Sequence, residues 1–329
     1  MNSTIFCLDL GVHYSRDGET KTSTPLQHWG NLDLSRISTC FEGLSRVDRK
    51  ALVSFVTAGD PAPPVTVPLL HGLVAAGADI LELGVPFSDP MADGPVIQRA
   101  SERALAAGVT LRGVLEMAKE FRARDDKTPL VLMGYANPME VMGYQRFATE
   151  AAAAGVDGVL TVDLPVEEAP PLLEAIRPHG IDPIFLLAPN TGRERIARIC
   201  QDASGFLYYV SLKGVTGAGH LDTGSVAEKV SEIRTLTGLP IGVGFGVKDG
   251  ASAARVARIS DAVVIGSVLV SRIEELAATP DRIPEEVPAI IAEMRGAMED
   301  YGGIEKEKNG PGVFFGWERA SALFFTLHT

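Results

Sequence analysis

Apolar and polar positions follow a regular order through the middle of the chain. Between about residues 50 and 270, short β-rich apolar runs alternate with longer segments whose apolar residues recur at helical spacing. Each short run is almost continuously apolar, which is typical of parallel strands covered on both faces. The eight predicted strands are LVSFVTA (52–58), DILELG (79–84), PLVLMGY (129–135), DGVLTVDLP (157–165), PIFLLAP (183–189), GFLYYVS (205–211), LPIGVGFG (239–246) and DAVVIGS (261–267).

Eight strands separated by helical stretches favour an α/β fold with a closed sheet over an open doubly wound sheet. The expected architecture is a single (β/α)8 TIM barrel. Distinctive loops such as TAGDP, GVPFSDPMADGP and SLKGVTGAG follow the strands, whereas short AGAD, AGVD or TGLP turns lead into them. Because the active sites of such barrels lie at the carboxyl ends of the strands, we expect the site among these loops.

Both ends of the chain depart from this pattern. Residues 1–34 and 300–329 lack the periodicity of the body and contain both tryptophans, Trp29 and Trp317. We therefore predict a barrel domain over residues 35–299, with one extra helix at its N-terminus. The two extensions are interpreted as appendages outside the barrel, either disordered or of artificial origin.

Composition narrows the class of protein. The chain has 329 residues, of which 46% are hydrophobic and 22% charged, as in an ordinary folded protein. A net charge of −12 argues against a nucleic-acid-binding surface. No segment has the pattern of a membrane span or a secretion signal. Cys7, Cys40 and Cys200 form no CxxC pair, so the sequence indicates neither a metal site nor a disulfide framework. We expect a cytoplasmic protein without a nucleic-acid or membrane partner.

The strand at 79–84 carries a carboxylate, Glu82, near its end. Alternation places Ile80, Glu82 and Gly84 on one side and Leu81 and Leu83 on the other. The leucines suit the helix-facing side, so Glu82 should point into the barrel mouth. Apolar surroundings there would raise its pKa, which suits a general acid/base. The alternative is a structural glutamate paired with a buried Arg or Lys, but no basic residue occupies any of the eight strands.

A second acid follows eleven residues later. Asp93 lies in a Pro-bounded loop that can return over the same mouth. Its alternative role is an Asx turn or the N-cap of a helix that begins near Pro95. Asp89, in SDP, fits turn chemistry better than catalysis, and His220 fits a solvated loop residue. No Ser/His/Asp set, HExxH or Walker loop is present, so nucleophilic and metal mechanisms lack candidates.

Glycine-rich turns follow the last three strands, at GVTGAG (214–219), GFG (244–246) and GS (266–267). Backbone N–H groups of such turns can hold a phosphate without Lys or Arg. Taken alone, the glycines of each turn have another explanation, because tight turns with a left-handed backbone commonly use glycine. Between these turns and the acids, we expect an apolar slot that suits a flat aromatic group, with part of the set serving only core packing. The residues expected to line it are Phe55, Met133, Tyr135, Leu160, Tyr208 and Phe245.

The segments around these residues resemble, in order and spacing, those of the tryptophan synthase α subunit family. Members of this family are indole-3-glycerol-phosphate lyases. The resemblance extends from about residue 35 to residue 299. It is carried by FVTAGDP (55–61), LELGVPFSDPMADGP (81–95), YANP (135–138), DLP (163–165), YYVSLKGVTG (208–217), GVGFGV (242–247) and IGS (265–267).

This resemblance implies a reaction and a set of residue roles. The reaction is the retro-aldol cleavage of indole-3-glycerol phosphate to indole and glyceraldehyde 3-phosphate, with no cofactor in this subunit. Indole would pass to a pyridoxal-phosphate-dependent β subunit in an α2β2 complex. The family's catalytic glutamate and aspartate fall on Glu82 and Asp93, and Tyr208 matches the tyrosine near the glycerol phosphate. The other matches are the indole wall at Phe55, Leu160 and Phe245, the phosphate turns at Gly217, Gly246, Gly266 and Ser267, the loop closure at Asp60 and Thr216, and the β-subunit contacts at Asp163 and Asn137–Pro138.

Three alternative functions stay open at this point. A free-standing lyase would release indole, and only the partner-facing loops argue against it. A non-catalytic activator of the β subunit would not need both carboxylates and the phosphate turns. A related barrel enzyme acting on a ribose or ribulose phosphate would not explain the aromatic slot beside this loop.

Overall fold

The computed structural model describes residues 12–13, 21–22, 35–211, 223–244 and 246–309. The chain forms two compact units, residues 1–34 and 35–329. In the first unit, β1 (Val12–His13) pairs antiparallel with β2 (Lys21–Thr22). In the second, the last helix, α13 (Pro288–Asn309), continues past residue 299. The predicted domain boundaries stay a prediction.

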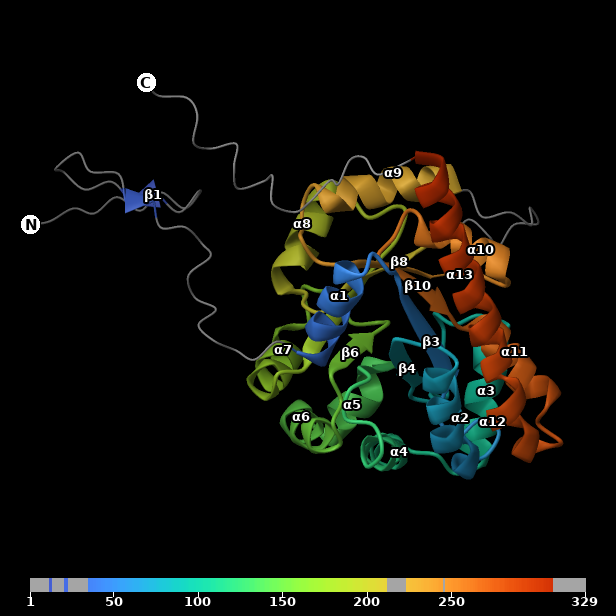
Figure 1. The fold of residues 1–329 in the computed structure, drawn as a ribbon. Helices are drawn as coiled ribbons and strands as arrows, with labels where there is room; N and C mark the ends of the chain where they lie inside the picture. Colours follow the sequence, from blue (N-terminus) through green and yellow to red (C-terminus); the bar gives the residue numbers. More distant parts are fainter. Residues whose placement is uncertain (1–11, 14–20, 23–34, 212–222, 245, 310–329) are drawn as a thin grey trace, which may run out of the picture. The chain divides into compact units, whose positions relative to one another are not determined.

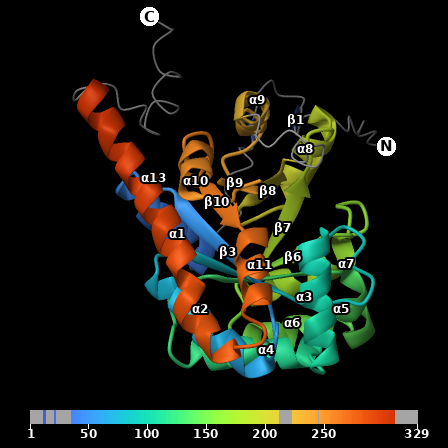
Figure 2. The same ribbon diagram turned by 90° about the vertical axis from the view of Figure 1, so that its right-hand side faces the viewer.

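Eight parallel strands close into a barrel with helices around it (Figures 1 and 2), which confirms the TIM-barrel prediction. The first and last barrel strands pair with each other, with Val53 beside Val264, and this pairing closes the sheet. The strands are β3 (Ala51–Thr57), β4 (Ile80–Gly84), β5 (Leu130–Gly134), β6 (Gly158–Thr161), β7 (Asp182–Leu187), β8 (Leu207–Val210), β9 (Ile241–Gly244) and β10 (Ala262–Ile265).

Helices surround the barrel, and none in the described residues combines the length and apolarity needed to cross a membrane. Pro residues occupy the first turn of several of them, where a missing N–H does no harm. The remaining helices are α1 (Arg36–Arg46), α2 (Pro63–Ala75), α3 (Pro95–Ala106), α4 (Leu111–Arg122), α5 (Ala136–Met142), α6 (Tyr144–Ala153), α7 (Pro170–Ile176), α8 (Arg193–Asp202), α9 (Thr223–Arg234), α10 (Gly250–Ala257), α11 (Ser267–Glu275) and α12 (Ile283–Glu286).

Helix α1 is the predicted extra helix, and it covers the N-terminal end of the barrel. Ile37, Phe41 and Leu44, at helical spacing, pack into the cluster that fills the barrel interior. The contact is close, because a Cβ atom on Gly158, the first residue of β6, would lie 2.9 Å from Ile37. Only the opposite end, where the strands terminate, is therefore left for a site.

Side-chain alternation along the strands divides the core in two. Val53, Ile80 and Val131 belong to the inner cluster that α1 joins, whereas Leu52 and Leu81 pack with the surrounding helices. Glu82 follows Ile80 by two positions and therefore faces inward, as the alternation predicts.

The turns that lead into the strands hold three aspartates that bind the neighbouring strand. The backbone N–H of Leu52 donates to Asp79 at 2.8 Å, that of Leu130 to Asp157 at 2.8 Å, and that of Ile241 to Asp261 at 2.9 Å. Each carboxylate also pairs with at least one arginine. These short turns, which have no distinctive sequence motif, thus stabilise the N-terminal end of the barrel through hydrogen bonds and ion pairs.

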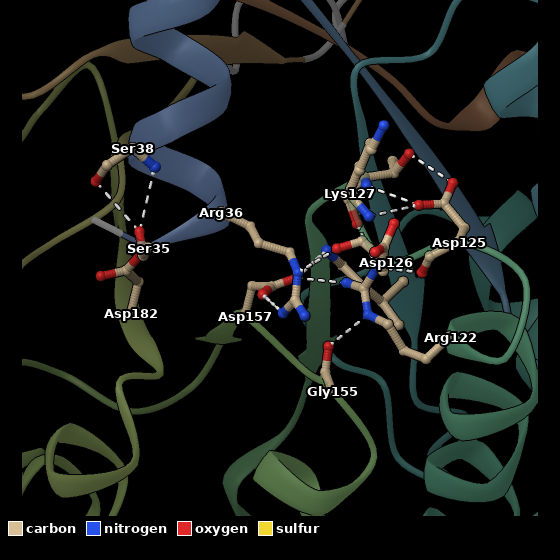
Figure 3. A network of polar contacts seen from close by, with 12 residues as sticks. Ser35, Arg36, Ser38, Arg122, Asp125, Asp126, Lys127, Gly155, Asp157 and Asp182 are labelled. Carbon is tan, nitrogen blue, oxygen red and sulfur yellow. Dashed lines mark hydrogen bonds and ion pairs between the residues drawn. The ribbon is translucent and has the colours of Figure 1, made fainter. Parts of the chain in front are cut away.

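Asp157 is the centre of one such polar network (Figure 3). Arg36, in the first turn of α1, donates to Asp157 at 2.7 Å, and Arg122 of α4 pairs with its other oxygen. Arg122 also donates to the Gly155 carbonyl at 2.8 Å. On the other side of α1, Ser35 donates to Asp182 at 2.6 Å. These contacts hold α1 across the end of the barrel.

Candidate active site

Glu82 is completely buried in the barrel and has no hydrogen-bond partner for either carboxyl oxygen in the described part of the chain. Its neighbours across the sheet are Phe55 on β3 and Val131 on β5. Burial in these apolar surroundings raises the pKa of Glu82 from its ordinary value of 4.5 to about 8. The carboxyl group is therefore mostly protonated at neutral pH, and no ion pair to a described residue supports the alternative of a structural, paired glutamate.

Tyr208 faces the barrel interior from β8. Its hydroxyl occupies the space above Gly244, where a Cβ atom would lie only 2.4 Å from the phenol oxygen. Burial, and then the charge of Glu82, raise the pKa of Tyr208 well above its ordinary value. The tyrosine therefore stays protonated in the electrostatic field of Glu82 and can act as a hydrogen-bond donor.

Asp93 lies at the mouth and contacts Tyr135. The Tyr135 hydroxyl donates to Asp93 Oδ2 at 3.2 Å and accepts from the backbone N–H of Ala92 at 3.0 Å. Burial raises the pKa of Asp93 above its ordinary value, and the bond from Tyr135 offsets only part of this rise. The N-cap of α3 is Gly94, so the Asp93 carboxyl group does not cap that helix. Asp89 accepts from Ser88 at 2.6 Å, a local contact of the kind expected for a turn residue.

One pocket collects Asp93 and three of the predicted slot residues. A Cβ atom on Gly84 would lie 2.7 Å from the Phe55 ring, so the missing side chain there makes room for the ring. Phe87 stacks on Tyr135 with ring centroids 4.9 Å apart. Leu160, in contrast, is fully buried in the inner cluster. The pocket is lined by Phe55, Thr57, Gly84, Val85, Asp93, Ile97, Ser101, Met133, Gly134, Tyr135 and Val162.

The predicted phosphate turns lie at the end of β10 and after β9. Gly266 is the N-cap of α11 and Ser267 is its first residue, so the first N–H groups of this helix begin there. A Cβ atom on Gly266 would lie 3.5 Å from the Phe55 ring, which places this turn next to the aromatic slot. Gly246 has a left-handed φ of 79°. Thr216, Gly217, Phe245 and His220 lie outside the described residues.

Asp60, predicted to take part in loop closure, is buried and bound on both oxygens by one residue. Arg103 donates from Nε to Oδ1 at 2.7 Å and from Nη2 to Oδ2 at 2.9 Å. Since Thr216 is outside the described residues, the closing contact between the two stays a prediction.

Two site features were missed at the level of sequence. Thr57 is 3% exposed, lines the pocket, and its hydroxyl has no hydrogen-bond partner among the residues that the structure describes. The alternation through Val53 and Phe55 would have placed it facing inward. Ser101, on α3, also lines the pocket, but nothing in the sequence distinguishes it from other helical serines.

No three described His, Cys, Asp or Glu side chains come together as a metal site would require. A second hollow, beside β8 and α9, includes no predicted site residue. It is lined by Pro189, Tyr209, Ser211, Ser225, Glu228, Lys229 and Glu232.

The closed barrel, with Glu82 buried inside it and Asp93 lining a pocket at its mouth, has the arrangement of a TIM-barrel enzyme whose site lies at the carboxyl ends of the strands. The model of the family described as tryptophan synthase alpha chain matches residues 41–299. The chain belongs to this family, which confirms the resemblance drawn from the sequence.

Individual relatives agree with this assignment. The tryptophan synthase alpha chain of Thioalkalivibrio sulfidiphilus is 62% identical over 266 residues, which cover 81% of this chain and 100% of the relative. The tryptophan synthase alpha chain of Nitrosococcus oceani is 59% identical over 266 residues, which cover 81% of this chain and 98% of the relative. The crystal structure of tryptophan synthase subunit alpha from Legionella pneumophila is 43% identical with a TM-score of 0.77, covering 82% of this chain and 100% of that one. A crystal structure of tryptophan synthase from Mycobacterium tuberculosis, in its aminoacrylate-bound form, is 34% identical with a TM-score of 0.71. The match covers 80% of this chain and 100% of that one.

Proposed function

We propose that Glu82 is the acid/base and Asp93 the anionic partner of the indole nitrogen in the reaction of this family. As a tryptophan synthase α subunit, the chain cleaves indole-3-glycerol phosphate to indole and glyceraldehyde 3-phosphate. The observation that carries the assignment is the buried carboxyl group of Glu82, which has no described hydrogen-bond partner and a pKa raised to about 8. A group with this pKa can both give and take a proton near neutral pH.

The chemistry needs both directions of proton transfer. Indole C3 takes a proton, and positive charge then develops on the ring nitrogen. The side-chain hydroxyl loses its proton as its C–O bond becomes the carbonyl of glyceraldehyde 3-phosphate. The electron pair of the broken C–C bond returns to the ring and restores indole. Glu82 can give the first proton as an acid and, once ionised, accept the second, so one carboxyl group serves both steps.

Asp93 is suited to the charge that appears on the nitrogen. It lies at the edge of the apolar slot, where the hydroxyl of Tyr135 orients its carboxylate at 3.2 Å. A carboxylate in such partly buried surroundings stabilises a developing cation more strongly than it would in water. We assign Phe55 and Met133 to the walls for the indole ring, and the start of α11 at Gly266–Ser267 to the phosphate.

Asp93→Asn is expected to lower kcat/KM for indole-3-glycerol phosphate by about 10²-fold, because the amide cannot balance the charge on the nitrogen. The measurement is steady-state release of indole by the full-length chain. Asp89→Asn, in the same loop, is the matched control and should remain within about twofold of the wild type, since the one side-chain contact of Asp89 with a described residue is the local bond from Ser88. Equal rates for the two variants would remove Asp93 from the mechanism.

The α subunit works with a β subunit, and we propose that the two form an α2β2 complex in which the β subunit holds pyridoxal phosphate and receives indole. Among the residues that the structure describes, two large apolar side chains are exposed near the mouth of the barrel, Met91 at 88% and Val141 at 82%. Met91 precedes Asp93 by two positions, and Val141 lies on α5, directly after β5. Asp163, which accepts from the Ala136 N–H at 2.8 Å, ties the loops after β5 and β6 together. These two side chains are the candidates that we assign to the contact with the β subunit.

Mixing the chain with a bacterial tryptophan synthase β subunit should give one species of α2β2 mass by size-exclusion chromatography with light scattering. Met91→Asp and Val141→Asp should each weaken the complex by about tenfold or more, because a charge would be buried in the interface. Val47→Asp is the matched control, since Val47 is 65% exposed but lies at the end of α1, on the opposite side of the barrel. Failure of the wild-type chain to bind would favour the free-standing lyase.

A further inference from the structure

Four charged side chains, on α3, on α11 and in the loop after β3, form a continuous ion network. Arg103 donates two hydrogen bonds to Asp60, at 2.7 and 2.9 Å, and a third to Glu274 at 2.9 Å. Arg99, one helical turn before Arg103, donates two to the same Glu274 at 2.6 and 2.8 Å. Arg103 is thus the one member of the four that binds two carboxylates.

The ion network joins three segments that carry parts of the site. Asp60 lies three residues after the end of β3, the strand that contributes Phe55. Arg103 lies on α3, which begins two residues after Asp93. Glu274 lies on α11, whose first turn is the proposed phosphate site. Both views of the ribbon place α3 and α11 beside each other (Figures 1 and 2).

An apolar contact lies between the same segments. Phe55, Ala100 of α3 and Val270 of α11 are buried against one another. Apolar packing holds the helices together but tolerates small shifts in position, whereas a two-pronged guanidinium–carboxylate pair has a fixed geometry. The side chain of Asp60 is 0% exposed, so any displacement of α3 that separated it from Arg103 would leave a buried carboxylate without this partner.

We propose that Arg103 is a positioning residue for the cleavage reaction. By binding Asp60 and Glu274 together, it fixes α3, and through α3 the loop of Asp93, relative to the phosphate turn at Gly266–Ser267. The proposal rests on the functions proposed above for Asp93 and for this turn. A displacement of a reacting group by about 1 Å can reduce a rate by about 10²-fold, so a fixed distance between these two parts matters for catalysis.

The first test is Arg103→Gln in the full-length chain. We expect kcat for indole-3-glycerol phosphate to fall by about 30-fold, with KM changed by less than about twofold. KM is expected to hold because α11 keeps its packing through Val270, which is buried. Arg103→Lys keeps the charge but lacks the two-pronged geometry, and its kcat should lie between those of the wild type and Arg103→Gln.

Arg272→Gln is the matched control. Arg272 is also an arginine bound to two carboxylates, those of Glu275 and Glu286, but its ion pairs join α11 only to itself and to α12 and do not involve α3. Its kcat should remain within about twofold of the wild type. Thermal unfolding of both variants shows whether a loss of rate merely follows a loss of stability.

The second test is a double-mutant cycle. If Asp60 acts by anchoring Arg103, Asp60→Asn and Arg103→Gln remove the same function, and the double variant should be no slower than the worse single one. If Asp60 acts independently, as in a direct closing contact with Thr216, the two losses multiply.

Multiplied losses, a wild-type kcat for Arg103→Gln, or a raised KM with unchanged kcat would each overturn the positioning role. These results differ from failure of the proposed function, which would appear as a wild-type chain that does not cleave the substrate or as a Glu82→Gln variant that does.

Discussion

Glu82→Gln is expected to reduce the cleavage of indole-3-glycerol phosphate by about 10³-fold or more, while substrate binding stays largely intact. Glutamine has nearly the same shape as a protonated glutamic acid, but it cannot give or accept a proton. The measurements are indole release at saturating substrate and, separately, binding of the substrate to the inactive variant. Retained turnover would show that another group moves the proton.

The matched control for this variant is Glu42→Gln on α1, at the other end of the barrel, where the glutamate is 47% exposed. It should have wild-type activity.

A folding control follows from the raised pKa of Glu82. Its pKa in the folded protein is about 8 against an ordinary value of 4.5, so the folded state holds a proton that the unfolded chain releases in this range. The resulting stability is fully present below pH 4.5 and is lost as the pH rises to about 8. Glu82→Gln should lack this contribution. The free energy of unfolding, measured with urea, should therefore decrease less between pH 6 and pH 8 for the variant than for the wild type.

Asp157→Ala is expected to lower the free energy of unfolding by about 3–5 kcal/mol, because it breaks a buried ion pair and leaves a cation without its partner. The guanidinium of Arg122, 10% exposed, would lose its carboxylate, and the Leu130 N–H would lose its acceptor. Arg36 is 41% exposed and can turn to water, so its lost contact adds little. Urea denaturation at pH 7 measures the difference.

Asp202→Ala provides the comparison, because Asp202 pairs with Arg177 where both side chains are partly exposed, and about 1 kcal/mol or less should be lost. Asp157→Asn keeps an acceptor for the Leu130 N–H, so its loss in free energy of unfolding should lie between those of Asp157→Ala and Asp202→Ala. The folded fraction of each variant should retain its catalytic rate, since Asp157 lies at the end of the barrel opposite Glu82. An Asp157→Ala loss no larger than that of Asp202→Ala would contradict the anchoring role.

The barrel and the direction of Glu82 could be predicted because both depend on local periodicity. Two residues per repeat in a strand decide which side chains face inward, so Ile80 and Glu82 must share a side whatever the rest of the chain does. The same rule would have found Thr57. Eight such strands with intervening helices leave few other closed arrangements.

The partners of charged residues could not be predicted in this way. Arg103 and Glu274 are 171 positions apart, and Arg295 binds Asp79 across 216 positions. Such pairs arise only when the sheet closes and brings distant helices together, so a local pattern contains no trace of them. The contact between Asp93 and the hydroxyl of Tyr135 likewise depends on the path of a loop that no periodicity constrains.

The isolated carboxyl group of Glu82 has a consequence for engineering this barrel. Replacing a buried polar group that lacks partners with an apolar residue of similar size removes a penalty, so thermal selection of random variants would favour Leu or Met at position 82. Such variants would tolerate heat better and release no indole. A library screened for heat resistance should therefore hold position 82 constant, because thermal stability favours an apolar side chain there and turnover requires the carboxyl group.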